Sequence, residues 1–201
     1  MVSGDLIMID AHFPTLVYHE HLRPLVDNKR VYNFALEIEN KYPSIKNFGV
    51  YNSLDSIDIS ENDLIKEIIL ITKVHIAKFL TELKVEEYSE IICKDVWINV
   101  SNEGDQQETH IHPKSHLSAV YYASAPENSG DLIFYSPTHH VNMFPIRYTK
   151  DSEVGMQIIN YTPREDLLMI FGSNLQHRVS RNLSKSKRVS VAMNFVLKFL
   201  Y

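Results

Sequence analysis

The second half of the chain constrains the fold most, because from residue 95 onward short apolar segments alternate with groups of turn-forming residues. Each segment has the length and composition of a β-strand, and the breaks between them are rich in Gly, Pro, Asn and Asp. Such a succession is typical of an antiparallel sandwich or barrel. The predicted strands are 95–100, 117–124, 131–135, 141–144, 166–171 and 188–197.

The first half has a different pattern of apolar and polar residues, which predicts one short strand at 15–19 and helices at 30–39 and 62–83. In the longer helix, apolar residues recur every three or four positions and form one stripe, which predicts packing against a sheet. Ser60 and Asp63 are the expected caps at its start. The stripe consists of Leu64, Ile68, Ile71, His75, Phe79 and Leu83.

Composition sets the class of protein. A chain of 201 residues with 44% apolar residues is expected to form one domain, 1–201, with a helical support region at 1–90 and a β core at 91–201. The fold class is therefore mainly β with a helical layer. A net charge of -5 from mixed acids and bases does not favour nucleic acid as a partner.

The location of the protein is predicted from two further features. Cys93 is the only cysteine, and the opening MVSGDLIMIDAHFP lacks the basic start and apolar run of a secretory signal. Both favour a reducing cytoplasm. No run of about 18 apolar residues indicates a membrane span.

Histidines carry the most chemical information, and two of them stand two residues apart. In an extended strand, His110 and His112 point to the same side, about 7 Å apart along the chain, so both can bind one metal ion. A neutral imidazole suits iron, zinc, copper or nickel, so the pair alone does not name the ion. Taken alone, the pattern also fits two solvent-facing histidines.

A second group of residues follows in PREDLLMIFGSNLQHRVSRNLSKSKRVSVAMNF. An apolar strand ends in a turn that presents His177, and Arg188 and Ser190 then lie two residues apart on one face of a returning strand. This combination resembles the 2-oxoglutarate (2OG) and iron(II) dependent oxygenases, whose double-stranded β-helix carries an early His-x-Asp/Glu, a late His and an Arg-x-Ser pair beyond it.

The resemblance is narrower than the superfamily. Three segments, over residues 12–19 and about 95–196, resemble a 2OG and iron(II) oxygenase family found in marine bacteria and phages. They are FPTLVYHEHL, WINVSNEGDQQETHIHPKSHLSAVYYASAPENSGDLIFYSP and the ending FGSNLQHRVSRN...KRVSVAMNF. This family implies a jelly-roll core with the N-terminal helices packed on one sheet. It also implies iron(II), 2OG and dioxygen as cofactor and cosubstrates, and the host cytoplasm as location if the gene belongs to a phage.

The resemblance also implies roles for individual residues. His110 matches the first metal ligand, His177 the distal ligand, Arg188 the cosubstrate anchor and Ser190 its helper. Two further residues, Asn99 in the segment W-x-N and Tyr122 in the segment V-Y-Y, resemble residues that play a smaller part around the cosubstrate or the metal.

One position departs from the superfamily pattern, because His112 stands where a carboxylate is usual. Three neutral imidazoles would leave the full charge of the ion uncompensated. Either the site uses three histidines, which the strand alternation favours, or a nearby Asp105, Glu108 or Asp131 supplies a carboxylate.

The expected reaction is oxidative decarboxylation of 2OG coupled to hydroxylation of an unidentified substrate, a small molecule or a peptide. The guanidinium of Arg188 can grip the far carboxylate of 2OG through paired hydrogen bonds. Residues 136–163 are long enough to form a rim around the substrate. The sequence does not give the oligomeric state, although a homodimer is the commonest arrangement among soluble oligomers.

Three other functions remain open. A cupin-type three-histidine dioxygenase or isomerase would share the barrel but not use 2OG, although the Glu that cupins carry four or five residues after the second His is replaced here by His116 and Leu117. A ligand-binding sandwich would need no metal. A zinc hydrolase would need a general-base carboxylate at a fixed spacing from the histidines, which the sequence does not provide.

Overall fold

The computed structural model describes residues 14–43, 49–138, 147 and 156–200. The predicted strand at 141–144 and most of the predicted substrate rim, with His139 and His140, lie outside these residues. No described helix is long and apolar enough to cross a membrane.

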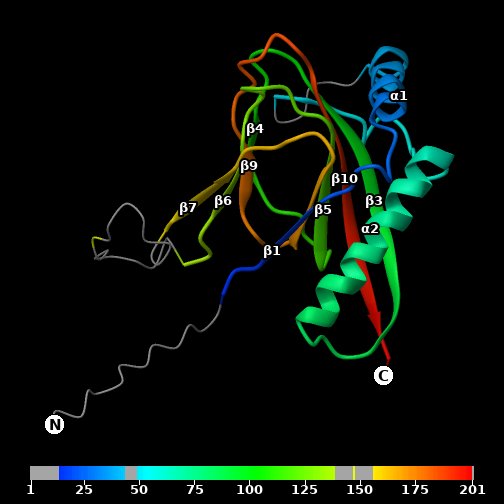
Figure 1. Cartoon of the computed structure of the whole chain (residues 1–201), viewed down its shortest axis with the longest axis vertical. Helices are drawn as coiled ribbons and strands as arrows, with labels where there is room; N and C mark the ends of the chain where they lie inside the picture. The colour runs from blue at the N-terminus through cyan, green and yellow to red at the C-terminus, as the bar shows by residue number, and fades with distance from the viewer. Residues whose placement is uncertain (1–13, 44–48, 139–146, 148–155, 201) are drawn as a thin grey trace.

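Two antiparallel sheets face each other (Figure 1). The larger has six strands in the order β1-β8-β5-β10-β3-β2, and the smaller has four in the order β4-β9-β6-β7. The larger sheet consists of β1 (Val17–His21), β2 (Tyr51–Asn52), β3 (Tyr88–Ser101), β5 (Leu117–Ser124), β8 (Leu167–Gly172) and β10 (Arg188–Phe199). The smaller consists of β4 (Gln107–His110), β6 (Leu132–Tyr135), β7 (Ile158–Tyr161) and β9 (His177–Val179).

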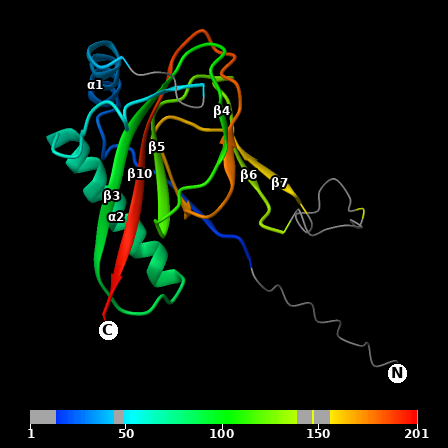
Figure 2. The same cartoon turned by 180° about the vertical axis from the view of Figure 1, so that it is seen from behind.

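Both helices, α1 (Asn28–Lys41) and α2 (Asp63–Glu82), lie on the side of the large sheet that faces away from the small one (Figure 2). Helix α2 begins one residue after Asn62, whose side chain accepts a hydrogen bond from the backbone N–H of Leu64 at 3.0 Å. The prediction of Ser60 and Asp63 as caps was therefore wrong. Asn62 has the extended backbone that a capping residue needs, whereas Asp63 is already helical.

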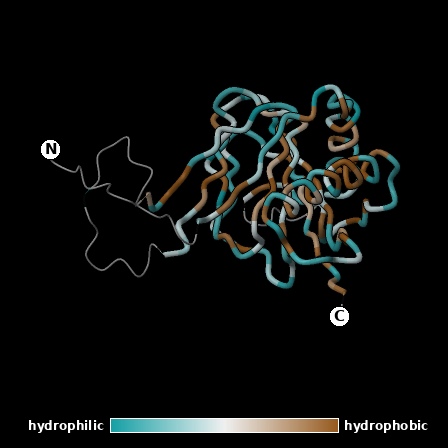
Figure 3. The backbone as a smooth tube through the Cα atoms, turned by 60° about the horizontal axis from the view of Figure 1, so that its bottom comes forward, coloured by the Kyte–Doolittle hydropathy of each residue, from teal (hydrophilic) through white to brown (hydrophobic). Residues whose placement is uncertain are grey.

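The hydrophobic core has two parts, one on each face of the large sheet. One cluster joins the helices to the sheet through residues such as Ile65, Ile76 and Val191. The other fills the space between the sheets and includes Met169 and Phe171. Strand β8 (LLMIFG), which contributes side chains to both clusters, is therefore apolar along its length. In Figure 3, hydrophobic stretches of the chain, coloured brown, lie among hydrophilic ones in the body of the molecule.

The predicted fold class is confirmed, while several boundaries differ from the prediction. Strand β3 begins at Tyr88, well before residue 95, because its first part pairs with the end of β10. Strands β2, β7 and β9 were not predicted, and β4 was expected only as an extended segment around His110 and His112, of which it includes His110 alone. They are short, and β4 (QETH) and β9 (HRV) lack the apolar alternation that marks a strand in a sequence, so only pairing with neighbours defines them.

Candidate active site

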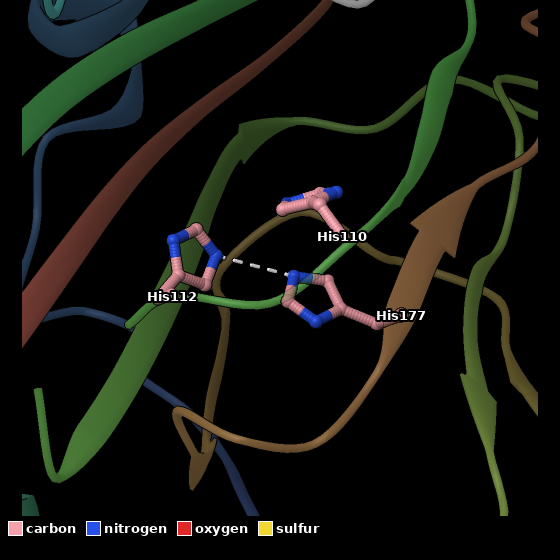
Figure 4. Close-up of side chains that lie close together, drawn as sticks. All are labelled: His110, His112 and His177. Atoms are coloured by element: carbon pink, nitrogen blue, oxygen red, sulfur yellow. Dashed lines mark hydrogen bonds between the residues drawn. The ribbon is translucent and has the colours of Figure 1, made fainter. Parts of the chain in front are cut away.

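Three histidine side chains meet between the two sheets. His110 ends β4 and His177 begins β9, and the two are direct partners in the antiparallel pairing of these strands. His112 lies just beyond β4, not within a strand as predicted, and its backbone N–H donates to the carbonyl of Ser173 at 2.9 Å. The three rings point toward one another (Figure 4), with centroids 4.3–5.1 Å apart.

The spacing of these side chains fits a single metal ion. One ring nitrogen from each histidine lies within 4.8 Å of the other two, and the Nε2 atoms of His112 and His177 are 3.2 Å apart. Imidazole nitrogens bind metals at about 2.0–2.1 Å, so neighbouring ligands of one ion lie about 3 Å apart. The geometry of the cluster thus suits an ion held by all three rings.

Backbone carbonyls fix the protonation of two of the rings. The Nδ1 atom of His177 lies 2.8 Å from the carbonyl oxygen of Leu175, and Nδ1 of His110 lies 2.7 Å from that of Glu108. Because a carbonyl can only accept a hydrogen bond, each Nδ1 carries the proton. Each Nε2 therefore keeps its lone pair for a metal, an arrangement common among histidine ligands.

The surroundings also keep the histidines uncharged. Burial, with a smaller contribution from neighbouring histidines, lowers the pKa of His177 to about 3. The same causes lower the pKa of His112 to about 4, and burial lowers the pKa of His110. Neutral imidazole is the form that binds metals, so protons do not compete for the site near pH 7.

No carboxylate of the described residues joins this cluster. The carboxylate of Asp105 accepts from the backbone N–H of Asn102 at 2.8 Å. Glu108 is exposed and contributes only its carbonyl, and Asp131 lines a separate hollow with Arg181. Of the two arrangements that the sequence left open, the structure assembles the three-histidine one.

The central strands of the large sheet form the floor of the same cavity. Ser190 on β10 is paired with Asn99 on β3 and with Tyr122 on β5, so these three side chains form one row across the sheet. Side chains alternate between the two faces of a strand, so residues two apart point the same way. Trp97, two residues before Asn99 on β3, therefore also lines the cavity.

Arg188 occupies the other end of this floor. It is only 4% exposed, and its Nη1 donates to the backbone carbonyl of Ser129 at 2.7 Å. Burial lowers its pKa, yet a guanidinium stays charged at any ordinary pH. The cavity therefore has neutral nitrogen ligands at one end and a fixed positive charge at the other.

Every residue with a predicted site role lines this one cavity, together with others that the sequence did not indicate. The cavity is lined by Trp97, Asn99, Gln107, His110, His112, Ser118, Ala119, Val120, Tyr122, Leu132, Phe171, His177, Val179, Arg188, Ser190, Ala192 and Met193.

Trp97 is the most informative cavity residue that was not predicted from the sequence. Its ring centroid lies 5.5 Å from that of His112, and its indole N–H is buried without a hydrogen-bond partner, as is the side-chain oxygen of Asn99. A buried polar group without a partner is costly, so both atoms indicate a bound molecule or water in the cavity. Because Trp97 stands two residues before Asn99 on the same strand, the alternation of side chains could have predicted it as a cavity residue.

A buried chain of hydrogen bonds supports His112 from behind. Asn194 donates to Asp95 at 3.1 Å and accepts from the hydroxyl of Ser118 at 2.9 Å. The hydroxyl of Ser118 lies 2.8 Å from that of Ser173, whose backbone carbonyl binds the N–H of His112. The position of His112 therefore depends on polar residues from three strands and a turn.

Comparison with known proteins agrees with this chemistry. Residues 95–194, which contain the three histidines, Arg188 and Ser190, match the model of the family described as "Putative 2OG-Fe(II) oxygenase". A search of curated proteins finds no matching sequence.

Several solved structures share the fold. A prolyl-4-hydroxylase from Pseudomonas putida is 12% identical, with a TM-score of 0.59 over 90% of this chain and 92% of that one. The viral collagen prolyl hydroxylase of Paramecium Bursaria Chlorella virus-1, in its 2OG complex, is 14% identical, with a TM-score of 0.58 over 89% and 95%.

A third similar structure is the carbocyclase SnoK of nogalamycin biosynthesis, described as non-heme and alpha ketoglutarate dependent. It is 13% identical, with a TM-score of 0.61 over 92% of this chain and 80% of that one. At these identities the likeness shows the fold, which is the double-stranded β-helix. The family match and the three-histidine site together identify the chain as a member of the 2OG-Fe(II) oxygenase family, which uses iron(II), 2OG and dioxygen.

Proposed function

We propose that this oxygenase couples oxidative decarboxylation of 2OG to hydroxylation of a C–H bond in a small molecule or a peptide. The observation that carries the proposal is the pairing, in one cavity, of three neutral histidines with the buried cation Arg188. A dianionic 2-oxo acid needs both: a metal for its 2-oxo acid end and a cation for its far carboxylate.

His110, His112 and His177 would hold iron(II), which with 2OG supplies the activation of dioxygen when bound. The contribution of the chain is to keep three nitrogen lone pairs aimed at one point. The carbonyls of Leu175 and Glu108 do this by holding the Nδ1 protons of two rings.

Arg188 would bind the far carboxylate of 2OG. A guanidinium forms paired, charge-assisted hydrogen bonds with a carboxylate, and these are strong where water is excluded. Ser190, two residues along β10 and 5% exposed, can donate a further bond. Tyr122 and Asn99, which flank Ser190 in the same row, would complete the polar floor.

Apolar residues would exclude water from the reacting end. Phe171 lies with its ring centroid 4.9 Å from that of His177, and Leu132 and Val179 line the cavity beside it. Such a wall removes water that would otherwise compete for the metal and weaken the charge interactions.

The class of substrate is proposed from the net charge of the chain, and a cytoplasmic location from its cysteine content. A net charge of -5 favours a small molecule or peptide over a nucleic acid. The free Cys93 suits a reducing cytoplasm.

Anaerobic titration of the iron(II)-loaded protein with 2OG tests the proposal. We expect the weak visible charge-transfer band of an iron-bound 2-oxo acid, and a loss of 2OG affinity in Arg188→Ala of about tenfold or more, since one charge-assisted hydrogen bond contributes about 1.5–3 kcal/mol. Arg181→Ala, at an exposed arginine outside the cavity, is the control. Iron binding without any band would overturn the proposal in favour of an oxygenase reaction that does not use 2OG.

A further inference from the structure

We propose that the turn at Ser129 and Gly130 is the element that orients Arg188 toward the cosubstrate, and that Gly130 is required there because a side chain would displace the guanidinium. This inference rests on the proposed function, since it concerns how the 2OG anchor is held. It assigns a positioning role to two residues that do not line the cavity.

The guanidinium of Arg188 is held along one edge by backbone oxygens. Its Nη1 lies 2.7 Å from the carbonyl oxygen of Ser129 and 3.5 Å from that of Gly130. A guanidinium carries five N–H donors in a rigid plane, so fixing one nitrogen fixes the direction of the remaining donors. Arg188 also lines the cavity, so the edge not held by the turn is the one available to a ligand.

Carbonyl groups orient the guanidinium without neutralising it. Arg188 donates to these two carbonyls, and the buried carboxylate of Asp105 attracts its charge. A carbonyl group has no net charge, so the turn orients the guanidinium and leaves its positive charge in place for an incoming carboxylate.

Gly130 has no room for a side chain. Its φ is +96°, a backbone conformation that favours glycine. A Cβ atom at this position would lie 2.3 Å from the carbonyl oxygen of Ser180 and 3.0 Å from Nη1 of Arg188. The backbone oxygen cannot retreat without moving β9, so the turn or the guanidinium must shift.

The turn itself is tied to the chain that leaves β9. The N–H of Asp131 donates to the Ser180 hydroxyl at 2.8 Å, and the N–H of Ser180 donates to the carbonyl of Asp131 at 2.9 Å. Leu183 donates from its N–H to the carbonyl of Asn128 at 2.8 Å. Because these bonds flank Ser129 and Gly130, the two carbonyls are held in place before any ligand arrives.

The chain offers a matched pair of glycines for the test. Gly104 has a similar φ of +87°, but nothing lies within 4 Å of a Cβ built on it. Gly104→Ala therefore introduces the same backbone strain as Gly130→Ala without the contact to Arg188. We expect Gly130→Ala to weaken 2OG binding about tenfold or more, since misplacing a binding group by about 1 Å has effects of this size, and Gly104→Ala to leave it unchanged.

Two binding measurements make the comparison: the iron(II) affinity of the metal-free protein, and the 2OG affinity of the iron-loaded protein by anaerobic calorimetry. Iron(II) affinity should be the same in wild type, Gly130→Ala and Gly104→Ala, because carbonyls of other segments, those of Leu175 and Glu108, hold the histidine rings. A parallel loss of iron in Gly130→Ala would show general damage to the site and would overturn a role specific to Arg188.

A double-mutant cycle separates an effect through Arg188 from any other effect. In an Arg188→Ala background, Gly130→Ala should have no further effect on 2OG affinity. An equal loss with and without Arg188 would overturn the inference. If Gly130→Ala does not fold, Ser180→Ala takes its place in the cycle: it removes the hydroxyl that ties Asp131 and should weaken 2OG binding by a smaller factor, again only when Arg188 is present.

The two proposals fail in different ways. If wild-type protein with iron bound takes up no 2OG, the proposed function is overturned and this inference with it. If wild type binds 2OG and the two glycine variants bind it equally well, only the role of the turn is overturned.

Discussion

The rings of His110 and His177 lie side by side across a pair of antiparallel strands, with their centroids 4.3 Å apart and their planes tilted by 56°. Both rings are therefore set by the register of β4 and β9, and each is held at Nδ1 by a carbonyl two residues before it in the chain. Strand pairing is stiffer than a loop, so we expect the metal site to be formed before iron binds.

The first prediction concerns the metal. His177→Ala should reduce iron(II) binding to the level of nonspecific uptake, because the two remaining histidines cannot surround an ion. His21→Ala, at an exposed histidine of β1, should bind one iron as wild type does. Metal content after gel filtration gives the answer, and one equivalent of iron retained by His177→Ala would rule out His177 as a ligand.

The second prediction uses Trp97, which is the only tryptophan of the chain. Because its ring lies 5.5 Å from that of His112, iron(II) bound at the histidines should quench its fluorescence. Selective excitation of the indole during anaerobic titration with iron(II) would show a fall that saturates at one equivalent. The same titration of His177→Ala should leave the emission unchanged, and equal quenching in that variant would place the metal elsewhere.

The third prediction concerns the hydrogen bonds behind His112. Asn194→Ala removes two hydrogen bonds, one to the hydroxyl of Ser118 and one to the carboxylate of Asp95, which together contribute about 1–3 kcal/mol of unfolding free energy. Because this chain of bonds ends at the backbone of His112, iron affinity should fall as well.

Ser124→Ala is the matched control for this network. Ser124 lies on the same strand as Ser118, and its half-buried hydroxyl donates to the carbonyl of Lys187 outside the cavity. Its removal should cost about 0.5–1.5 kcal/mol of unfolding free energy and leave iron affinity unchanged. Denaturant unfolding together with iron titration checks both variants, and unchanged iron affinity in Asn194→Ala would contradict a positioning role.

The fourth prediction concerns pH. His75 of α2 is 5% exposed and lies 2.8 Å from the hydroxyl of Tyr18, and burial is the main cause that lowers its pKa, with Lys78 adding to the effect and Glu20 opposing it. A lowered pKa in the folded state means that the unfolded chain binds the proton more readily. The contribution to stability is therefore complete above the ordinary histidine pKa of about 6.5 and is lost as the pH falls below it.

His75→Gln, which can still accept from Tyr18, should lose this part of the pH dependence. Unfolding free energies of wild type and variant, measured between neutral and mildly acidic pH, should converge as the pH falls. A constant difference across this range would show that His75 does not titrate with unfolding.

The class of fold and the chemistry of the site could be predicted from the amino-acid sequence alone. Alternating strands in the second half, the amphipathic pattern of α2 and the spacing of His110, His112, Arg188 and Ser190 are local features, so they can be read without a structure. The long apolar strands of the large sheet, β5, β8 and β10, were predicted from composition. The start of β3 was predicted too late, because pairing with β10, not composition, sets where that strand begins.

The assembly of the site depends on tertiary contacts that the sequence does not reveal. The pairing of β4 with β9, two polar strands without a sequence pattern of their own, brings His110 beside His177 and leaves no described carboxylate in the cluster. The placement of Gly130 against Arg188 likewise depends on contacts between distant parts of the chain. Such relationships arise from hydrogen bonding and packing across the fold, because residues far apart in the sequence carry no local signal of their closeness.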